Sequence, residues 1–217
     1  MIHTAGGEGS VALGDTERAQ AIVATEILPG RSSSERLIPA VRHLMAENGW
    51  RLNGLTAVMV VHGPGSFTGV RVGVSAAKGL SEAGAVPLIA VSRLALLAAS
   101  VDGREKRVHA VLDAGRGEFY YGEYVGERCV REALMSAQDM TTVASDGLVV
   151  VCELKVAEVL VELRPKLVDE PLAGAALPFA VKRVESAQFE DTATLDANYL
   201  RRTDAEIFAK PAPRATR

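Results

Sequence analysis

Short apolar stretches separated by glycine-containing turns open the chain. Three of them predict β-strands, at Met1–Thr4, Glu8–Leu13 and Gln20–Ile27. Gly6-Gly7 and Gly14-Asp15 lie between these stretches, and such pairs favour tight turns between neighbouring strands. We therefore expect an antiparallel meander at the start of the chain.

A helical pattern follows the meander. In the run RSSSE, Ser32 can cap the first helical amides while the Glu35 carboxylate returns to the cap. Apolar side chains then recur at helical spacing, at Leu37, Val41, Leu44 and Met45. The pattern predicts an amphipathic helix over Glu35–Asn48, which Gly49 would end.

The next elements alternate between strand and helix. Leu55–Val61 and Pro87–Val91 are almost continuously apolar, which is typical of buried strands that pair in parallel. Thr68–Ala83 lies between them and has a helical pattern despite three glycines, and Ser92 can cap a further helix up to about Ser100. The first half therefore predicts the order β-β-β-α-β-α-β-α.

The second half partly repeats this order, which suggests an internal structural duplication. Strands are predicted at Val108–Asp113, Glu118–Tyr124, Arg128–Leu134 and Leu148–Cys152, and helices at Val156–Leu163 and Gly174–Ser186. We expect one lobe over residues 1–102 and a second over residues 103–209. Residues 210–217 combine proline with positive charge and are predicted to be a disordered tail.

Composition limits the classes of function. The 217 residues are 48% hydrophobic and 24% charged, which suits a globular protein, and the net charge of −3 gives no overall attraction to nucleic acid. No apolar run approaches the ~18 residues of a membrane helix, and the N-terminus lacks the pattern of a signal peptide. A cytoplasmic location is therefore expected. Cys129 and Cys152 have no metal-like spacing and are expected to be buried, reduced thiols.

The segment GPGSFTG joins a predicted strand to a predicted helix. Glycine there permits positive φ and close backbone approach, and a helix start attracts anions. Gly63, Gly65 and Ser66 are therefore candidates to face a nucleotide. The segment matches neither of the common nucleotide-binding glycine motifs, so a purely structural turn stays open as the alternative.

Small residues gather on one side of the following helix. Gly69, Gly73 and Ala76 share this side and Val72 flanks it. Glycine inside a helix costs up to about 1 kcal/mol relative to alanine, so the repeat indicates that another helix approaches closely. That helix could belong to this chain, as Glu35–Asn48 does, or to a partner subunit.

Several segments together resemble the TsaB family. The central block is GPGSFTGVRVGVSAAKGL followed by VPLIAVSRLALLA, and further pieces are GRSSSERLIPAV, VLDAGRGEFYYGEY and ANYLRRTDAE, in the family's order. The resemblance implies a two-lobed α/β fold of the actin-like ATPase (ASKHA, ribonuclease H-like) class. It also implies a non-catalytic subunit that pairs with TsaD and TsaE for threonylcarbamoyl transfer to N6 of adenosine 37 in tRNAs that read ANN codons.

The resemblance further implies where partners and cofactors bind. The first-lobe helices would contact TsaD, with a homodimer possible when the chain is alone. By position, the partner-binding residues would be Glu35, Leu37, Val41, Thr68, Gly69, Val72, Gly73 and Ala76. The tRNA would be reached only through the complex. No cofactor is expected on this chain alone, whereas ATP or ADP and a divalent metal are expected in the partner subunits.

The sequence departs from the family's pattern at two places. His3 stands where family members carry an aspartate at the end of a longer first strand, and a neutral histidine cannot replace a carboxylate ligand of a hard cation. A start codon assigned too far downstream would explain the clipped strand, and a stop codon just before Met1 would exclude this. Ser33 replaces a histidine, which affects only a family-specific contact.

Enzymatic alternatives have less support. A metal-dependent peptidase needs clustered ligands, and His3, His43, His62 and His109 have no such spacing. A nucleotide-binding ATPase could use Asp113 after its strand, although this side chain can equally form the turn with Gly115. Arg201 and Arg202 form a basic pair that could contact tRNA, or could be a solvated surface pair.

Overall fold

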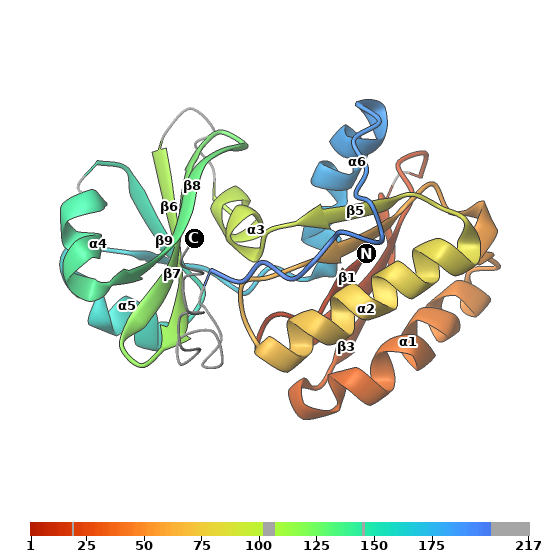
Figure 1. Cartoon of the computed structure of the whole chain (residues 1–217), viewed down its shortest axis with the longest axis horizontal. Coiled ribbons are helices and arrows are strands. Elements are labelled where there is room, and N and C mark those ends of the chain that lie inside the picture. Colours follow the sequence, from red (N-terminus) through yellow and green to blue (C-terminus); the bar gives the residue numbers. More distant parts are fainter. Residues whose placement is uncertain (19, 102–106, 145, 201–217) are drawn as a thin grey trace, which may run out of the picture.

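In a computed structural model of the protein, residues 1–18, 20–101, 107–144 and 146–200 are described. They form two lobes, each built on a five-stranded mixed sheet (Figure 1). The first sheet has the order β3-β2-β1-β4-β5. Its strands are β1 (Ile2–His3), β2 (Gly9–Gly14), β3 (Ile22–Leu28), β4 (Val58–Val61) and β5 (Leu88–Val91).

Helices cover both faces of the first sheet. On one face, α1 (Ser33–Glu47) and α2 (Phe67–Gly84) lie side by side (Figure 1). The other face is covered by the short helix η4 (Ala173–Ala176) and by α6 (Leu177–Glu185). The β-β-β-α-β-α-β-α order predicted for this lobe is confirmed, with α3 (Arg93–Ala99) as its last helix.

The second sheet repeats the first. Its order, β8-β7-β6-β9-β10, is the order of the first sheet with each strand replaced by its counterpart. Its strands are β6 (Arg107–Gly115), β7 (Glu118–Val125), β8 (Arg128–Ser136), β9 (Leu148–Val151) and β10 (Lys166–Leu167). Its helices are α4 (Ala137–Val143), α5 (Leu154–Val159) and the short η3 (Val161–Leu163). The suggested duplication is therefore present in the topology.

At the boundary between the lobes, each half of the chain supplies a helix that packs on the sheet of the other half. Leu94 and Leu97 of α3 are buried in the core of the second lobe, so α3 packs on β6 and β7 and lies between the two sheets (Figure 1). Conversely, η4, α6 and the segment that follows them return to the first sheet, where Ala176 of η4 and Ala197 join its core. The expected boundary at residue 102 separates the sheets, but it assigns α6 to the wrong lobe.

The start of α1 differs from the predicted capping box. A 3-10 turn, η1 (Gly30–Ser32), precedes the helix, and Ser32 has φ −103° and ψ 6°. An N-cap side chain reaches the helical amides from an extended backbone, which Ser32 lacks. Its hydroxyl donates instead to the Pro29 carbonyl oxygen, 3.1 Å away. The predicted capping bonds at Ser32 and Glu35 are therefore wrong, although the helix begins where expected.

The amino group of Met1 makes stability depend on pH. It is buried, it donates to the Ala12 carbonyl oxygen at 2.8 Å, and burial lowers its pKa from 8.0 to about 6. The unfolded chain therefore binds the proton more tightly between pH 8 and pH 6, and stability falls as pH falls through this window. We expect a loss of at most about 3 kcal/mol, measured by urea unfolding at both pH values.

The matched control for this pH dependence is the N-terminally acetylated chain, whose amide does not titrate. Subtracting its pH dependence removes the contributions of every other group, including the histidines. An equal loss of stability in both forms would contradict the assignment to Met1.

Candidate functional site between the lobes and on the α2 face

The HGPGSF loop packs against the first turn of its own lobe. The Ser66 N–H donates to the Ala5 carbonyl oxygen at 2.9 Å, and a Cβ on Gly65 would overlap that same oxygen. Gly63 has φ +108° and lies beneath the Asn198 backbone, whose N–H donates to the His62 carbonyl oxygen. The glycines predicted to face a nucleotide therefore face protein backbone, as the structural-turn alternative requires.

Ser66 has a structural role in the same loop. Its hydroxyl oxygen accepts a hydrogen bond from the Gly69 N–H at 3.2 Å and so caps α2. One amide of the helix start is thus already satisfied within the chain.

The Gly6-Gly7 turn between β1 and β2 holds an anion from the second lobe. The Gly7 N–H donates to Oε2 of Glu170 at 3.4 Å, and a Cβ on Gly6 would overlap the Glu170 carboxylate. Oε1 of Glu170 accepts from the Arg93 guanidinium at 2.6 Å. The same Arg93 nitrogen lies 3.3 Å from Glu153, so one buried cation joins two carboxylates.

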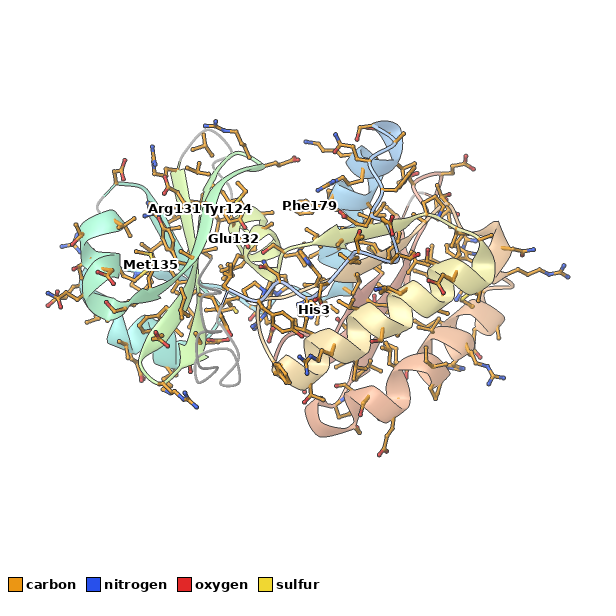
Figure 2. All side chains as sticks on the ribbon, viewed as in Figure 1. His3, Tyr124, Arg131, Glu132, Met135 and Phe179 are labelled. Carbon is orange, nitrogen blue, oxygen red and sulfur yellow. The ribbon has the colours of Figure 1, made fainter. Side chains whose placement is uncertain are left out.

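His3 lies beside this cation, at the edge of the first lobe that faces the second (Figure 2). His3 and Arg93 are 1% and 4% exposed as whole residues. Among the described residues, neither ring nitrogen of His3, nor Nε of Arg93, has a hydrogen-bond partner. Burial, reinforced by the Arg93 charge, lowers the pKa of His3 to about 3. His3 is therefore neutral at physiological pH, unlike an aspartate at the same place.

Asp113 joins the same cluster through its backbone. Its N–H donates to Oε2 of Glu153 at 2.7 Å, while its carboxylate accepts from the Gly115 N–H at 2.7 Å. Lys155 lies 3.5 Å from the other carboxylate oxygen. The carboxylate thus forms the turn with Gly115, which was the alternative to a nucleotide-facing role.

The predicted partner-binding residues divide into two groups. Glu35 and Thr68 are exposed, and Gly69, Val72 and Ala76 are partly exposed. Leu37, Val41 and Gly73 are buried within the chain itself. Leu37 and Val41 belong to the core of the first lobe because α1 packs on β2 and β3. Gly73 faces the same lobe, since a Cβ there would overlap the Thr4 hydroxyl. These three cannot contact a partner, so their prediction as contact residues is corrected.

An exposed aromatic cluster, not predicted from the sequence, stands at the start of α2. The Arg71 guanidinium lies 3.6 Å from the ring centroid of Phe67, and its Nε donates to the Tyr199 hydroxyl at 2.5 Å. Phe67 is 50% exposed. A guanidinium over an aromatic ring is attracted by the ring's quadrupole, so the cluster holds an aromatic ring and a cation together at the surface.

This cluster is continuous with the exposed side of α2. We call the set Phe67, Thr68, Arg71, Ser75 and Gly79 the α2 face, since these exposed residues recur at helical spacing. A hollow of about 190 Å³ lies beside it, between α2 and the segment Leu195–Tyr199. Lys78 closes its rim by donating to the Leu195 carbonyl oxygen at 3.2 Å.

The remaining sequence candidates are dispersed. His43 is exposed, His62 is partly exposed, and His109 is buried between the Tyr121 hydroxyl and the Asp146 carbonyl oxygen. Within the described ranges, no three His, Cys, Asp or Glu side chains gather as a metal site. Cys129 is exposed, contrary to expectation, and Cys152 is half-buried. Arg201, Arg202 and residues 210–217 lie outside the described residues.

No described helix is both long and apolar enough to cross a membrane.

Sequence comparisons match this chain to one family profile and to curated proteins of one description. A family profile described as "TsaD: tRNA N6-adenosine threonylcarbamoyltransferase" matches residues 25–207. "tRNA threonylcarbamoyladenosine biosynthesis protein TsaB" of Escherichia coli is 38% identical over 101 residues, 46% of this chain and 43% of that protein. The protein of the same description from Bacillus subtilis is 34% identical over 110 residues, 51% of this chain and 48% of that protein. The chain thus matches about half the length of these curated relatives.

A solved structure extends the likeness over nearly the whole chain. An uncharacterized protein from Pseudomonas aeruginosa, titled as similar to peptidase YEAZ, superposes with a TM-score of 0.77 at 28% identity. The match covers 92% of this chain and 97% of that one.

Proposed function

Because the chain belongs to the TsaD family of tRNA N6-adenosine threonylcarbamoyltransferases, we propose that it is an accessory subunit of a tRNA-modifying complex. In this role it pairs with a TsaD-type catalytic subunit, and works with a TsaE-type ATPase, in threonylcarbamoyl transfer to N6 of adenosine 37 of tRNAs that read ANN codons. The duplicated sheet order and the solved relative agree with the actin-like fold of such proteins. ATP or ADP and a divalent metal would be held by the partner subunits, in the cytoplasm.

The arrangement of Glu170, Arg93 and His3 between the lobes is the observation that supports a non-catalytic role. Glu170 fills the Gly6-Gly7 turn and is held there by Arg93. A nucleotide phosphate at this turn would have to displace a carboxylate already bonded to a buried cation. The neutral His3 beside it offers no hard-cation ligand. These features favour a subunit that assembles over one that hydrolyses a nucleotide.

The α2 face supports pairing with a partner helix. It combines short side chains, which let a second helix approach closely, with the Phe67 ring, which leaves apolar area to bury. Aromatic and arginine side chains are the residues that most often dominate protein–protein binding energies. The proposed contact therefore uses the exposed side of α2, together with Glu35 and Ala76, and leaves the buried side of the helix to the core.

The test is binding of the purified chain to the TsaD-type subunit of the same organism, by size-exclusion chromatography and calorimetry. We expect a stable heterodimer, and we expect Ser75→Arg to weaken it at least tenfold because the new side chain separates two closely packed helices. Thr142→Arg on α4 is the matched control, since Thr142 is also a short, exposed polar residue in a helix. It should bind as the unmodified chain does.

Each outcome decides a different part of the proposal. Failure of the unmodified chain to bind would overturn the accessory role, and equal binding by Ser75→Arg would overturn only the α2 contact. Steady ATP turnover by the purified chain alone would favour the ATPase alternative.

A further inference from the structure

The segment of residues 195–200 contacts both lobes, and we call it the strap. In Figure 1 it is the blue segment that runs from the first lobe toward the second. Leu195 and Ala197 pack in the core of the first lobe, whereas Leu200 packs against the core of the second. The chain therefore passes from one lobe to the other within the two residues between Ala197 and Leu200.

Asn198, the first of these two residues, bonds to both lobes at once. Its backbone N–H donates at 2.8 Å to the carbonyl oxygen of His62, which directly follows β4. Its side-chain Nδ2 donates at 2.6 Å to Oε2 of Glu132 on β8. The other oxygen of Glu132 accepts from the hydroxyl of Tyr124, a buried residue of the second lobe (Figure 2). The second lobe thus fixes Glu132, and Glu132 fixes the side chain of Asn198.

Tyr199, the next residue of the strap, belongs to the exposed aromatic cluster on α2. Its hydroxyl accepts from Nε of Arg71 at 2.5 Å, and its ring centroid lies 6.0 Å from that of Phe67. In the chain, Tyr199 lies between Asn198 and Leu200, which both contact the second lobe. The exposed side of α2 in the first lobe therefore carries a ring whose position depends on the second lobe.

We propose that Glu132 and Asn198 are positioning residues for the α2 face, and that the strap makes partner binding there depend on the arrangement of the two lobes. A change in the angle between the lobes would move Glu132 relative to α2, and Tyr199 would follow its neighbour Asn198. Arg71, which lies over Phe67 and donates to Tyr199, would then lose one of these two contacts. The inference rests on the proposed function, because it takes the α2 face as the partner contact.

The strap contains few residues that could absorb a movement of Asn198. On one side, Lys78 donates to the Leu195 carbonyl oxygen at 3.2 Å, and Ala197 is buried in the core of the first lobe. On the other side, Tyr199 follows directly, and consecutive Cα atoms are about 3.8 Å apart. A displacement of Asn198 by a few ångströms is therefore passed on to Tyr199.

A second contact between the lobes supplies the matched control. Nζ of Lys182 on α6 lies 2.5 Å from Oε2 of Glu127, in the turn between β7 and β8. Among the described residues, neither member of this pair forms a hydrogen bond to the strap. Glu127→Ala thus removes a carboxylate that joins the lobes from the same hairpin as Glu132, but it leaves the strap intact.

The position of Tyr199 can be followed by fluorine NMR without any partner. The chain has four tyrosines, so incorporation of 3-fluorotyrosine gives four resonances, and Tyr199→Phe identifies that of Tyr199. In Asn198→Ala and in Glu132→Ala, we expect this resonance to sharpen and to move toward the position of a solvated tyrosine. In Glu127→Ala, we expect it to stay where it is in the unmodified chain.

Calorimetry with the TsaD-type subunit measures the consequence for binding. We expect Asn198→Ala to weaken the heterodimer about threefold to tenfold, because binding must then order a side chain that the strap no longer holds. Glu127→Ala should bind as the unmodified chain does, since its strap is unchanged.

Each outcome bears on a different step. A Tyr199 resonance that stays in place in Asn198→Ala and Glu132→Ala would overturn the positioning role, and so would an equal shift in Glu127→Ala, which would indicate general loosening between the lobes. A displaced resonance with unchanged affinity would overturn the coupling to binding and leave the proposed function intact. An unmodified chain that binds no partner would overturn the proposed function and the coupling together, while the fluorine result would still decide the positioning role.

Discussion

Arg93→Met is expected to destabilise the protein by about 2–4 kcal/mol. Losing one partner of a buried ion pair typically costs about 3–5 kcal/mol. Here the substitution leaves two carboxylates, those of Glu153 and Glu170, without the cation that both contact. Glu153 and Glu170 keep side-chain exposures of 30% and 27%, so solvent screens part of the loss. Chemical unfolding monitored by circular dichroism measures the change.

The compensating control removes the charges that Arg93 neutralises. Adding Glu153→Gln and Glu170→Gln to Arg93→Met should restore a large part of the lost stability, because no uncompensated charge then remains between the lobes. Amide exchange at Gly7 should accelerate in Arg93→Met, since Glu170 loses the cation that positions it. A triple variant no more stable than Arg93→Met alone would show that the lost contact is packing, not charge.

The element order could be predicted because it depends on local periodicity. The β-β-β-α-β-α-β-α order of the first lobe follows from apolar runs and glycine turns that lie within a few residues of each other. The helix α4 was missed, although Ser136 and Asp139 form the capping box that marks its start. β10 has only two residues, too few for any pattern to appear.

The site between the lobes could not be predicted, because its contacts join distant parts of the chain. Glu170 reaches Gly7 across 163 positions of sequence, and Tyr199 reaches Arg71 across 128. No local pattern contains such pairs. The small residues of α2 were recognised, but helical spacing alone does not say which side of the helix meets the sheet. Thr4 decides this, because its backbone and hydroxyl oxygens occupy the space beside Gly69 and Gly73.

Gly69→Ala and Gly79→Ala therefore should change stability in opposite directions, although both replace glycine by alanine in the same helix. A Cβ on Gly69 would overlap the Thr4 carbonyl oxygen, and this backbone atom, directly after the central strand β1, cannot move aside as a flexible side chain can. We expect Gly69→Ala to cost about 2–3 kcal/mol, as over-packed cores do. Thermal unfolding should show the loss as a lower melting temperature.

Gly79 is the matched control because a Cβ there meets no atom within 4 Å. Only the helix propensity changes, so Gly79→Ala should stabilise the protein by about 0.5–1 kcal/mol. At about 2–4 °C per kcal/mol for a chain of this size, the two variants should melt roughly 5–15 °C apart. Equal melting temperatures would mean that the Thr4 backbone yields to the new methyl group, and would contradict the close contact at Gly69.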